Sequence, residues 1–348
     1  MTDDCENTGP YCWIRCSIFV VIAFIILIIL AALIIWFLID QYKKRFKQNY
    51  MLNTITYCAK LEPIKYTSTV SKPEQDNLYE YRLARALLEA SILVSQSNCT
   101  NISVTNPEGF NQQTRIITSH PKTGNNRMVA TVFSDKEEST DYANRILIVF
   151  SGTFFLDEWA TDMNFPLTDA TDLRNYIPGV KLHTGFYNLY QSARKQLWSI
   201  IENTCDINTE LYITGHSLGG ALATISAYDF ARYKPVCYTF ASPRTGNNTF
   251  ANTFNRLVPN CMRIYNIDDT ITNLPLPIMA GNVYQHVNSG IAFDINMGNL
   301  RDNHITAYVK YLPECIPNVA PCPTSIRTTI SEQTNVPVYP TYYPNRQY

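Results

Sequence analysis

The sequence has almost no net charge and no cysteine pattern that indicates a metal site. Its 348 residues carry 28 Lys and Arg against 29 Asp and Glu, which gives a net charge of −1. Proteins that bind nucleic acid usually carry a basic face, so we expect no nucleic-acid partner. The seven Cys that follow residue 39 form no C-x-x-C pair and no spacing typical of zinc ligands. Internal repeats are also absent.

One long apolar run lacks charge entirely. Ser17 to Ile39 contains 23 uncharged residues, of which 18 are Ile, Leu, Val or Phe. As a helix it would span roughly 34 Å, enough to cross the hydrocarbon core of a bilayer. A cleavable signal peptide would have a shorter apolar core and a small-residue cleavage site, and neither occurs here; Arg15 precedes the run, but so do Asp3, Asp4 and Glu6. The sequence therefore predicts a permanent single transmembrane helix at 17–39, after a short N-terminal segment, 1–16.

Two opposing signals leave the orientation of this span open. Acidic residues precede the span and four basic residues follow it: Lys43, Lys44, Arg45 and Lys47. The positive-inside rule then favours a cytoplasmic C-terminal domain. A lumenal or extracellular domain is favoured instead by three N-x-[ST] sequons: Asn98, Asn101 and Asn247. The sequence fixes neither the orientation nor the membrane.

The rest of the chain divides into three regions by composition. Residues 40–76 form a basic juxtamembrane segment and a polar connector. Residues 77–312 have the strand and helix patterns of a folded domain. Residues 313–348 are rich in Pro, Thr and Tyr and contain no Gly, which predicts a disordered tail.

The segment Leu211 to Lys234 changes from a strand pattern to a helix pattern at a glycine-rich turn, in LYITGHSLGGALATISAYDFARYK. Ser217 lies in this turn within the pattern G-x-S-x-G, and helical spacing begins at Ala221. A strand before and a helix after this pattern predict a nucleophile elbow, a tight turn that presents the Ser Oγ at the sheet edge. Flanking glycines let neighbouring backbone pass without Cβ clashes. The alternative is a Ser that only caps the following helix.

Apolar runs around this turn predict the other elements of the domain. Ile146 to Phe150 is a continuous apolar run, typical of a strand buried on both faces. Further strands are expected at 236–241, 262–267 and 290–295, and two more within 114–133. Helices are expected at 77–95 and after the segment 179–190, where the second helix runs to about residue 202. This order predicts an α/β-hydrolase fold, with a doubly wound, mostly parallel sheet whose site lies at the carboxyl ends of the strands.

The loop after the strand at 146–150 supplies candidates for an oxyanion hole and a lid. It reads SGTFFLDEWATD from Ser151. In an α/β-hydrolase one oxyanion donor follows the nucleophile and the other comes from such a loop, which selects the N–H groups of Leu218 and Thr153. The aromatic and apolar residues that follow predict a lid that contacts lipid: Phe154, Phe155, Leu156 and Trp159. The alternative is that these side chains only pack the loop.

A serine nucleophile also needs a base and an acid that orients it, and in this fold they follow the Ser in the order acid, base. Two of the five His follow the turn, His286 and His304. Asp268 and Asp269 come where the strand at 262–267 ends, on the same sheet edge as Ser217. Position therefore selects this acidic pair, and both histidines remain candidate bases.

Several stretches together resemble the class 3, or fungal-type, lipases, over roughly Leu78 to Leu312. NIDDTITNLP at 266–275 resembles the segment that carries the catalytic Asp in that family. DNHITAY at 302–308 resembles the family's Asp-His-x-x-Tyr, with Asn303 inserted between the Asp and the His. Three further segments match: VFSGT at 149–153, with Ser151 where an Arg is common, HTGF at 183–186 and GHSLGG at 215–220.

This resemblance implies a catalytic triad of Ser217, Asp269 and His304, which needs no metal or organic cofactor. It also implies that Thr153 contributes to the oxyanion hole together with Leu218. His286 is then a rival base or a structural residue near the substrate cleft. His183 and His216 are expected to be buried and hydrogen-bonded.

The sequence thus predicts a membrane-anchored serine lipase that hydrolyses glycerolipid esters through an acyl-enzyme. The lipid would be a triacylglycerol, a diacylglycerol or a phospholipid at a membrane or lipid interface. Two alternatives stay open: a carboxylesterase or acyltransferase that acts on a non-lipid ester, and a catalytically inactive membrane protein of the same fold.

Overall fold

The computed structural model describes residues 20–38, 40–41, 81–97, 103–119, 126–152, 166–279, 281–288 and 290–311. The chain separates into two compact units, Met1–Leu61 and Glu62–Tyr348, and each is described by itself. The predictions for segment 1–16, for the connector beyond residue 41 and for the tail 313–348 lie outside the described residues.

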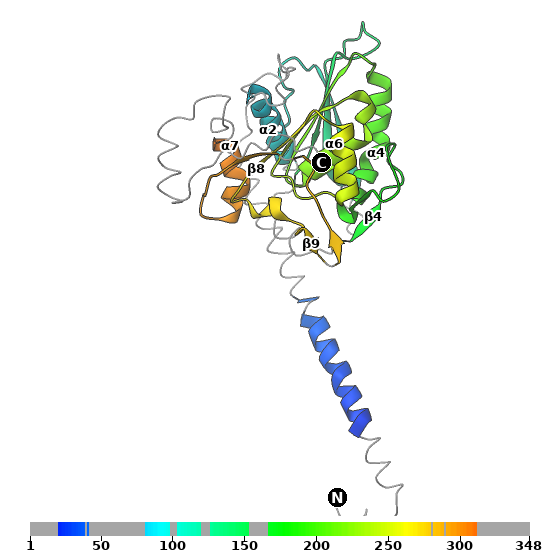
Figure 1. Ribbon diagram of the computed structural model, residues 1–348, viewed down its shortest axis with the longest axis vertical. Helices are drawn as coiled ribbons and strands as arrows, with labels where there is room; N and C mark the ends of the chain where they lie inside the picture. The colour runs from blue at the N-terminus through cyan, green and yellow to red at the C-terminus, as the bar shows by residue number, and fades with distance from the viewer. Residues whose placement is uncertain are drawn as a thin grey trace, which may run out of the picture. The chain divides into compact units, whose positions relative to one another are not determined.

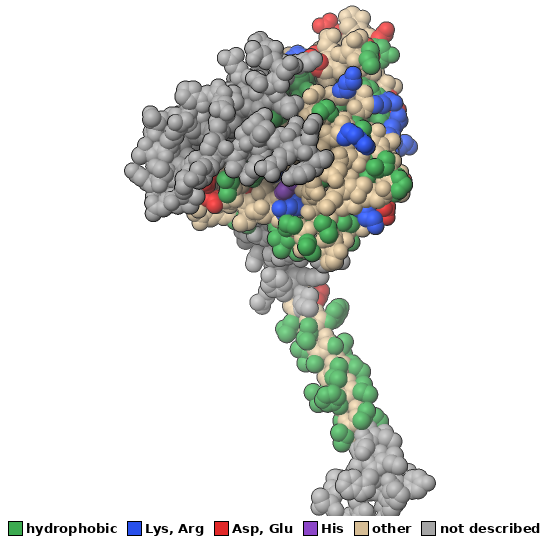
Figure 2. Space-filling model, in the orientation of Figure 1, with side chains coloured by type: hydrophobic (Ala, Val, Ile, Leu, Met, Phe, Trp, Pro, Cys, Tyr) green, Lys and Arg blue, Asp and Glu red, His purple; other side chains and the backbone are tan. Residues whose placement is uncertain are grey.

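The first unit contains one described helix, Val20–Leu38. Its mean hydropathy is 3.4 and none of its apolar window is buried, so apolar side chains cover its visible face (Figure 2). It is long and apolar enough to cross a membrane, and a signal sequence would also meet that description. The predicted apolar helix is confirmed, whereas its role as a permanent anchor remains a proposal.

The second unit is built on a seven-stranded sheet with the order β1-β2-β3-β6-β7-β8-β11. Strands β1, β2 and β3 pair antiparallel, and every pairing from β3 to β11 is parallel. The strands are Gln112–Ser119 (β1), Asn126–Ser134 (β2), Arg145–Phe150 (β3), Glu210–His216 (β6), Val236–Phe240 (β7), Cys261–Asn266 (β8) and Ile291–Phe293 (β11). The predicted mostly parallel sheet is confirmed.

Helices cover both faces of this sheet (Figure 1). The helices that connect the parallel strands pack together on one face: Thr184–Thr204 (α4), Leu218–Asp229 (α5) and Asn248–Leu257 (α6). Two helices from the ends of the domain, Tyr81–Gln96 (α2) and Ala307–Tyr311 (α7), contact each other, and α2 lies on the other face. Side chains along β6 alternate between the two faces of the sheet. Ile213 packs in the core with α4 and α5, whereas Thr214 Oγ1 lies 3.2 Å from Ser91 Oγ on α2.

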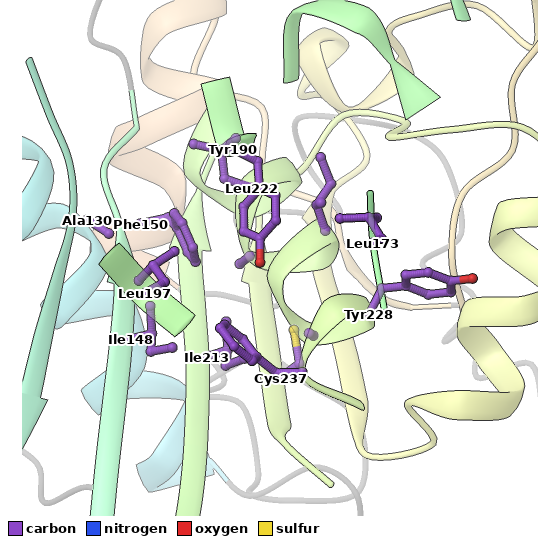
Figure 3. Close-up of a cluster of buried hydrophobic side chains, with 14 of the residues drawn as sticks. Ala130, Ile148, Phe150, Leu173, Tyr190, Leu197, Ile213, Leu222, Tyr228 and Cys237 are labelled. Carbon is purple, nitrogen blue, oxygen red and sulfur yellow. The ribbon is translucent and has the colours of Figure 1, made fainter. Parts of the chain in front are cut away.

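The main core lies between the sheet and α5 (Figure 3). Phe150 and Ile213 from the strands pack with Tyr190 of α4 and Leu222 of α5, and all four side chains are fully buried. Every residue of α5 is buried, and its Gly- and Ala-rich sequence lets it lie close to the strands. Each large apolar side chain buried here contributes about 1.5–3 kcal/mol, so the turn before α5 rests on a well-packed core.

Helix α6 was not predicted from the sequence. Its residues NTFANTFNRL include three Asn and two Thr, which have low helix propensity. Two features compensate: the N-cap Asn247 accepts a hydrogen bond from Phe250 N, and Phe250 and Phe254 are buried in the core.

The remaining elements are short. Two small strand pairs lie outside the main sheet, Leu167–Asp169 (β4) with Lys181–His183 (β5) and Ile278–Met279 (β9) with Asn282–Val283 (β10). Single turns of 3₁₀-helix occupy Ala231–Tyr233 (η1) and Thr270–Asn273 (η2), and a π-helical turn occupies Asp302–Thr306 (η3).

Candidate active site

Ser217 occupies a strained turn between β6 and α5. Its backbone has φ 59° and ψ −125°, a region that costs a residue with a side chain of the order of 1–3 kcal/mol. Its side chain makes no capping hydrogen bond to α5. The alternative that this Ser serves only as a helix cap is therefore wrong.

The glycines of the G-x-S-x-G pattern are required by close backbone contacts. A Cβ on Gly215 would overlap the carbonyl oxygen of Gly219, and a Cβ on Gly219 would overlap the carbonyl oxygen of Phe150. Any side chain at either position would therefore push the first turn of α5 away from the strands. The pattern follows from the packing of this turn, and the packing in turn holds Ser217 at the carboxyl edge of the sheet.

Two residues that are distant in sequence meet at this edge. Asp269 lies in the turn after β8, His304 lies in the π-helical turn η3, and both side chains are fully buried. His304 Nδ1 and Asp269 Oδ2 are 2.8 Å apart. Because a carboxylate only accepts, Nδ1 carries the hydrogen and Nε2 carries the lone pair. His304 Nε2 is buried and has no hydrogen-bond partner among the described residues, so it is free to accept a proton.

Asp269 is also held by two neutral donors. Ile271 N donates to Oδ1 over 3.1 Å, and Tyr308 OH donates to Oδ2 over 2.9 Å. Tyr308 OH in turn accepts a hydrogen bond from Asn266 N at 2.8 Å. Burial raises the pKa of the Tyr308 hydroxyl well above its usual range, so it keeps its proton. Sequence reasoning assigned no role to Tyr308, although it closes the Asp-His-x-x-Tyr pattern and so lies one helical turn after His304.

His216 packs against His304, and the centroids of the two rings are 4.8 Å apart. Its Nε2 donates to the His304 carbonyl oxygen over 2.7 Å. Burial, followed by the nearby His304, lowers the pKa of His216 well below its ordinary value, so it stays neutral beside the proposed base. The prediction of a buried, hydrogen-bonded residue is confirmed for His216 and for His183, whose Nδ1 accepts from Phe186 N.

The rival base, His286, has a different environment. Its Nε2 donates to the Thr272 carbonyl oxygen over 2.8 Å. Burial lowers its pKa well below its ordinary value, and the positive charges of Arg263 and Arg244 lower it further. These contacts favour the structural interpretation of His286. The other member of the acidic pair, Asp268, is only partly buried, and its backbone carbonyl, rather than its carboxylate, contacts the His304 turn.

The structure describes only part of the predicted oxyanion hole and none of the predicted lid residues. Leu218 is the first residue of α5, where a backbone N–H has no partner within the helix and the helix dipole favours negative charge. Thr153 and the lid residues lie outside the described residues: Phe154, Phe155, Leu156 and Trp159. Just before them, Gly152 N donates to Ser95 Oγ over 2.8 Å, which fastens the end of β3 to α2.

The described residues contain no group of three or more His, Cys, Asp or Glu side chains that could hold a metal ion. The polar groups found at the sheet edge are instead Ser217 on its strained turn and the buried Asp269–His304 pair. A serine on a strained turn, with a buried carboxylate–histidine pair from later turns, defines the α/β-hydrolase class of serine hydrolases.

Comparison with known proteins finds a family that matches part of this domain. Residues 147–279 match the family described as Lipase (class 3). That match includes Ser217 and Asp269, and it ends before His304.

Curated relatives also match part of the chain. A chloroplastic galactolipase from Arabidopsis thaliana is 35% identical over 178 residues, which cover 43% of this chain and 38% of the relative. Secreted mono- and diacylglycerol lipase 1 from Fusarium solani is 31% identical over 169 residues, which cover 47% of this chain and 46% of the relative. The chain thus spans less than half the length of these relatives.

Among solved structures, the mono- and diacylglycerol lipase from Aspergillus oryzae is 21% identical. The alignment covers 63% of this chain and 80% of that chain, with a TM-score of 0.47.

Proposed function

We propose that this chain is a serine lipase that hydrolyses carboxylic ester bonds of glycerolipids. The observation that carries the proposal is the buried Asp269–His304 hydrogen bond, which leaves His304 Nε2 without a described partner at the sheet edge where Ser217 lies. A neutral imidazole with a free Nε2, held by a carboxylate on Nδ1, has the tautomer required of a general base.

In the proposed mechanism, Ser217 Oγ attacks the ester carbonyl carbon while His304 Nε2 takes the hydroxyl proton. The bond between carbon and the leaving oxygen then breaks, and His304 returns the proton to the leaving alcohol. Water attacks the acyl-enzyme by the same route and releases the fatty acid. Asp269 stabilises the imidazolium formed in both halves, and the N–H groups of Leu218 and Thr153 stabilise the oxyanion. None of these steps uses a metal or an organic cofactor.

The proposed substrate class is supported by the family and by the relatives. They are named as a galactolipase, a phospholipase A1 and a mono- and diacylglycerol lipase, names that share a lipid and differ in head group. We therefore propose a glycerolipid ester and leave its head group to experiment. The segment from Phe154 to Trp159 is proposed as a lid that contacts the lipid surface.

The test uses the purified full chain in detergent micelles, incubated with a serine-reactive fluorophosphonate and then with dispersed lipids. We expect labelling at Ser217 alone, and fatty-acid release from at least one of triacylglycerol, diacylglycerol or phospholipid. Labelling with turnover of only short, soluble esters would favour a carboxylesterase. No labelling at all would favour an inactive protein of this fold.

We also propose that the helix Val20–Leu38 is a permanent single-pass anchor. Its exposure and its mean hydropathy of 3.4 support this. Sequencing of the N-terminus of the mature protein, together with extraction of membranes by alkaline carbonate, would test it. Loss of the first residues by cleavage would instead show a signal sequence.

One of the three sequons has a structural explanation. Asn247 Oδ1 accepts from Phe250 N at the start of α6, and Asn247 Nδ2 donates to the Gly179 carbonyl oxygen over 2.8 Å. Helix capping therefore accounts for this Asn without a glycan, while Asn98 and Asn101 lie outside the described residues. Asn247 therefore gives little support to a lumenal domain. We propose a cytoplasmic domain, as the basic residues after the span favour.

A further inference from the structure

The turn that carries His304 contains one residue more than an α-helical turn. Residues Asp302–Thr306 are π-helical, and Ala307 N donates to the Asp302 carbonyl oxygen, five residues earlier. A π-helical turn absorbs a single extra residue within a helix. Asn303, which separates the Asp and the His in this chain, is therefore accommodated inside the turn, and both His304 and Tyr308 still contact Asp269.

The side chain of this extra residue fastens two neighbouring segments to the turn. Asn303 Oδ1 accepts from Met297 N over 2.6 Å, in the segment after β11. Asn303 Nδ2 donates to the Asp268 carbonyl oxygen over 3.1 Å, in the turn after β8. The residue is only 8% exposed, and losing either bond would leave a partly buried backbone group unpaired.

Asn266 makes a second connection between the same segments. Its Nδ2 donates to the Asn303 carbonyl oxygen over 3.1 Å and to the Ile295 carbonyl oxygen over 2.8 Å. Its Oδ1 accepts from Ile295 N over 3.0 Å, and it is fully buried. Two buried asparagines therefore join three backbone segments: the turn after β8, the segment after β11 and the π-helical turn.

The bond from Asn303 to Asp268 is aligned with the bond between the proposed base and acid. Asn303 immediately precedes His304, and Asp268 immediately precedes Asp269. The pairs 303–268 and 304–269 are thus hydrogen-bonded side by side, at 3.1 Å and 2.8 Å. A displacement of one backbone segment relative to the other would lengthen both bonds together.

We infer that Asn303 is a positioning residue that holds His304 in register with Asp269. This inference rests on the proposed function, since it assigns Asn303 an effect on turnover through His304. Removal of the Asn303 side chain frees the π-helical turn to shift against the turn after β8. Small displacements of a catalytic group cost up to about 10²-fold in rate, and they leave the substrate-binding surface unchanged.

The experiment compares the full chain with its Asn303→Ala variant in detergent micelles. We expect kcat to fall about 10- to 100-fold, with KM changed less than about twofold. The acidic limb of the pH profile of kcat/KM should move to lower pH, because a looser carboxylate stabilises the imidazolium less. Fluorophosphonate labelling of Ser217 should slow in parallel. Asn303→Asp, which keeps the acceptor for Met297 N and loses the donor to Asp268, should also lower kcat.

Asn296→Ala is the matched control, because this exposed Asn lies in the segment after β11 and, among the described residues, its Oδ1 accepts only from Gly298 N. It should leave kcat, KM and the pH profile unchanged. Equal kcat and equal labelling rates in the wild type and both Asn303 variants would overturn the inference. A loss in the variants that disappears when the temperature is lowered would also overturn it, since it would reflect unfolding alone. A wild-type chain that is never labelled would instead overturn the proposed function, and the positioning role with it.

Discussion

Two buried carboxylates lie in different regions of the domain, and their partners differ in kind. Asp229, in the last turn of α5, accepts from Arg194 Nε at 2.7 Å, from Trp198 Nε1 at 2.7 Å and from Tyr190 OH at 2.9 Å. Its second oxygen accepts from Arg194 Nη2 and from the Arg174 backbone N. A permanent positive charge and a complete set of donors therefore hold this carboxylate.

Asp269 is equally buried, but the part of the chain that the structure describes places no Lys or Arg in an ion pair with it. Among the described residues its only ion-pair partner is His304, and the other two donors, Ile271 N and Tyr308 OH, are neutral. A buried charge without a cation is costly. The cost is recovered whenever His304 becomes protonated, as the proposed mechanism requires twice per turnover. Asp229 thus stabilises the resting fold, whereas in the proposed mechanism Asp269 stabilises a charge that forms during the reaction.

The largest effect that would sharpen this comparison is expected at the nucleophile. Ser217→Ala should lower ester turnover by about 10⁶-fold. It should not lower the free energy of unfolding, because the Ser217 side chain makes no capping hydrogen bond that the substitution would remove. Release of fatty acid and urea unfolding would be measured on the same preparation. Ser226→Ala, on the same helix, is the control and should retain turnover. A fully active Ser217→Ala would refute the proposed triad.

The next largest effect is expected at Asp269, and it separates this residue from its neighbour Asp268. Asp269→Asn should lower turnover by about 10⁴-fold, because the amide donates to Nδ1 and forces the hydrogen onto Nε2. The neighbouring Asp268→Asn should cost less than about tenfold, since only its backbone carbonyl contacts the His304 turn. Steady-state kcat of both variants tests this. Reversed effects would place the acid one residue earlier.

Asp229→Asn should have the opposite effect: it should lower the free energy of unfolding and leave turnover nearly unchanged. Removing one member of a buried ion pair costs about 3–5 kcal/mol of unfolding free energy, and we expect the lower end because Arg194 is 20% exposed. Turnover per folded molecule should stay within about twofold, because no Asp229 contact reaches the sheet edge. Urea denaturation combined with active-site titration separates the two quantities. A loss of turnover in fully folded protein would contradict the division between the two carboxylates.

Much of this site could be predicted from the sequence because its signals are local. The elbow needs glycine at fixed spacing from Ser217, and a strand and a helix on either side of it leave recognisable apolar patterns. The choice between Asp268 and Asp269 could not come from the residues alone, since adjacent residues at a strand end share the same edge; the resemblance favoured Asp269, which the His304 contact also favours.

Contacts between distant segments left no local signal. Asn303 looked like an insertion, and only the π-helical turn shows how it is accommodated. The role of Tyr308 depends on a turn nearly forty residues earlier, at Asp269. Helix α6 was missed because its stability comes from Phe250 and Phe254 in the core rather than from propensity.

The smallest expected effect concerns acid stability, and it tests whether buried histidines away from the edge behave as fixed neutral groups. Burial lowers the pKa of His183 from 6.5 to about 4. Between these values the unfolded chain binds a proton that the folded chain does not, so stability falls as the pH drops below 6.5. The contribution of His183 is present in full above that pH and declines towards pH 4. By this linkage the wild type should lose about 2 kcal/mol of unfolding free energy through His183 between pH 8 and pH 5.

The variant His183→Asn tests this expectation, because it keeps a side-chain acceptor for Phe186 N at the start of α4 and removes the titrating group. The difference in unfolding free energy between wild type and variant should therefore shrink by this amount over the same range, as measured by urea denaturation. Because His216 and His286 are unchanged in both proteins, their titration cancels in the difference. A difference that stays constant from pH 8 to pH 5 would show that His183 is protonated in the folded domain.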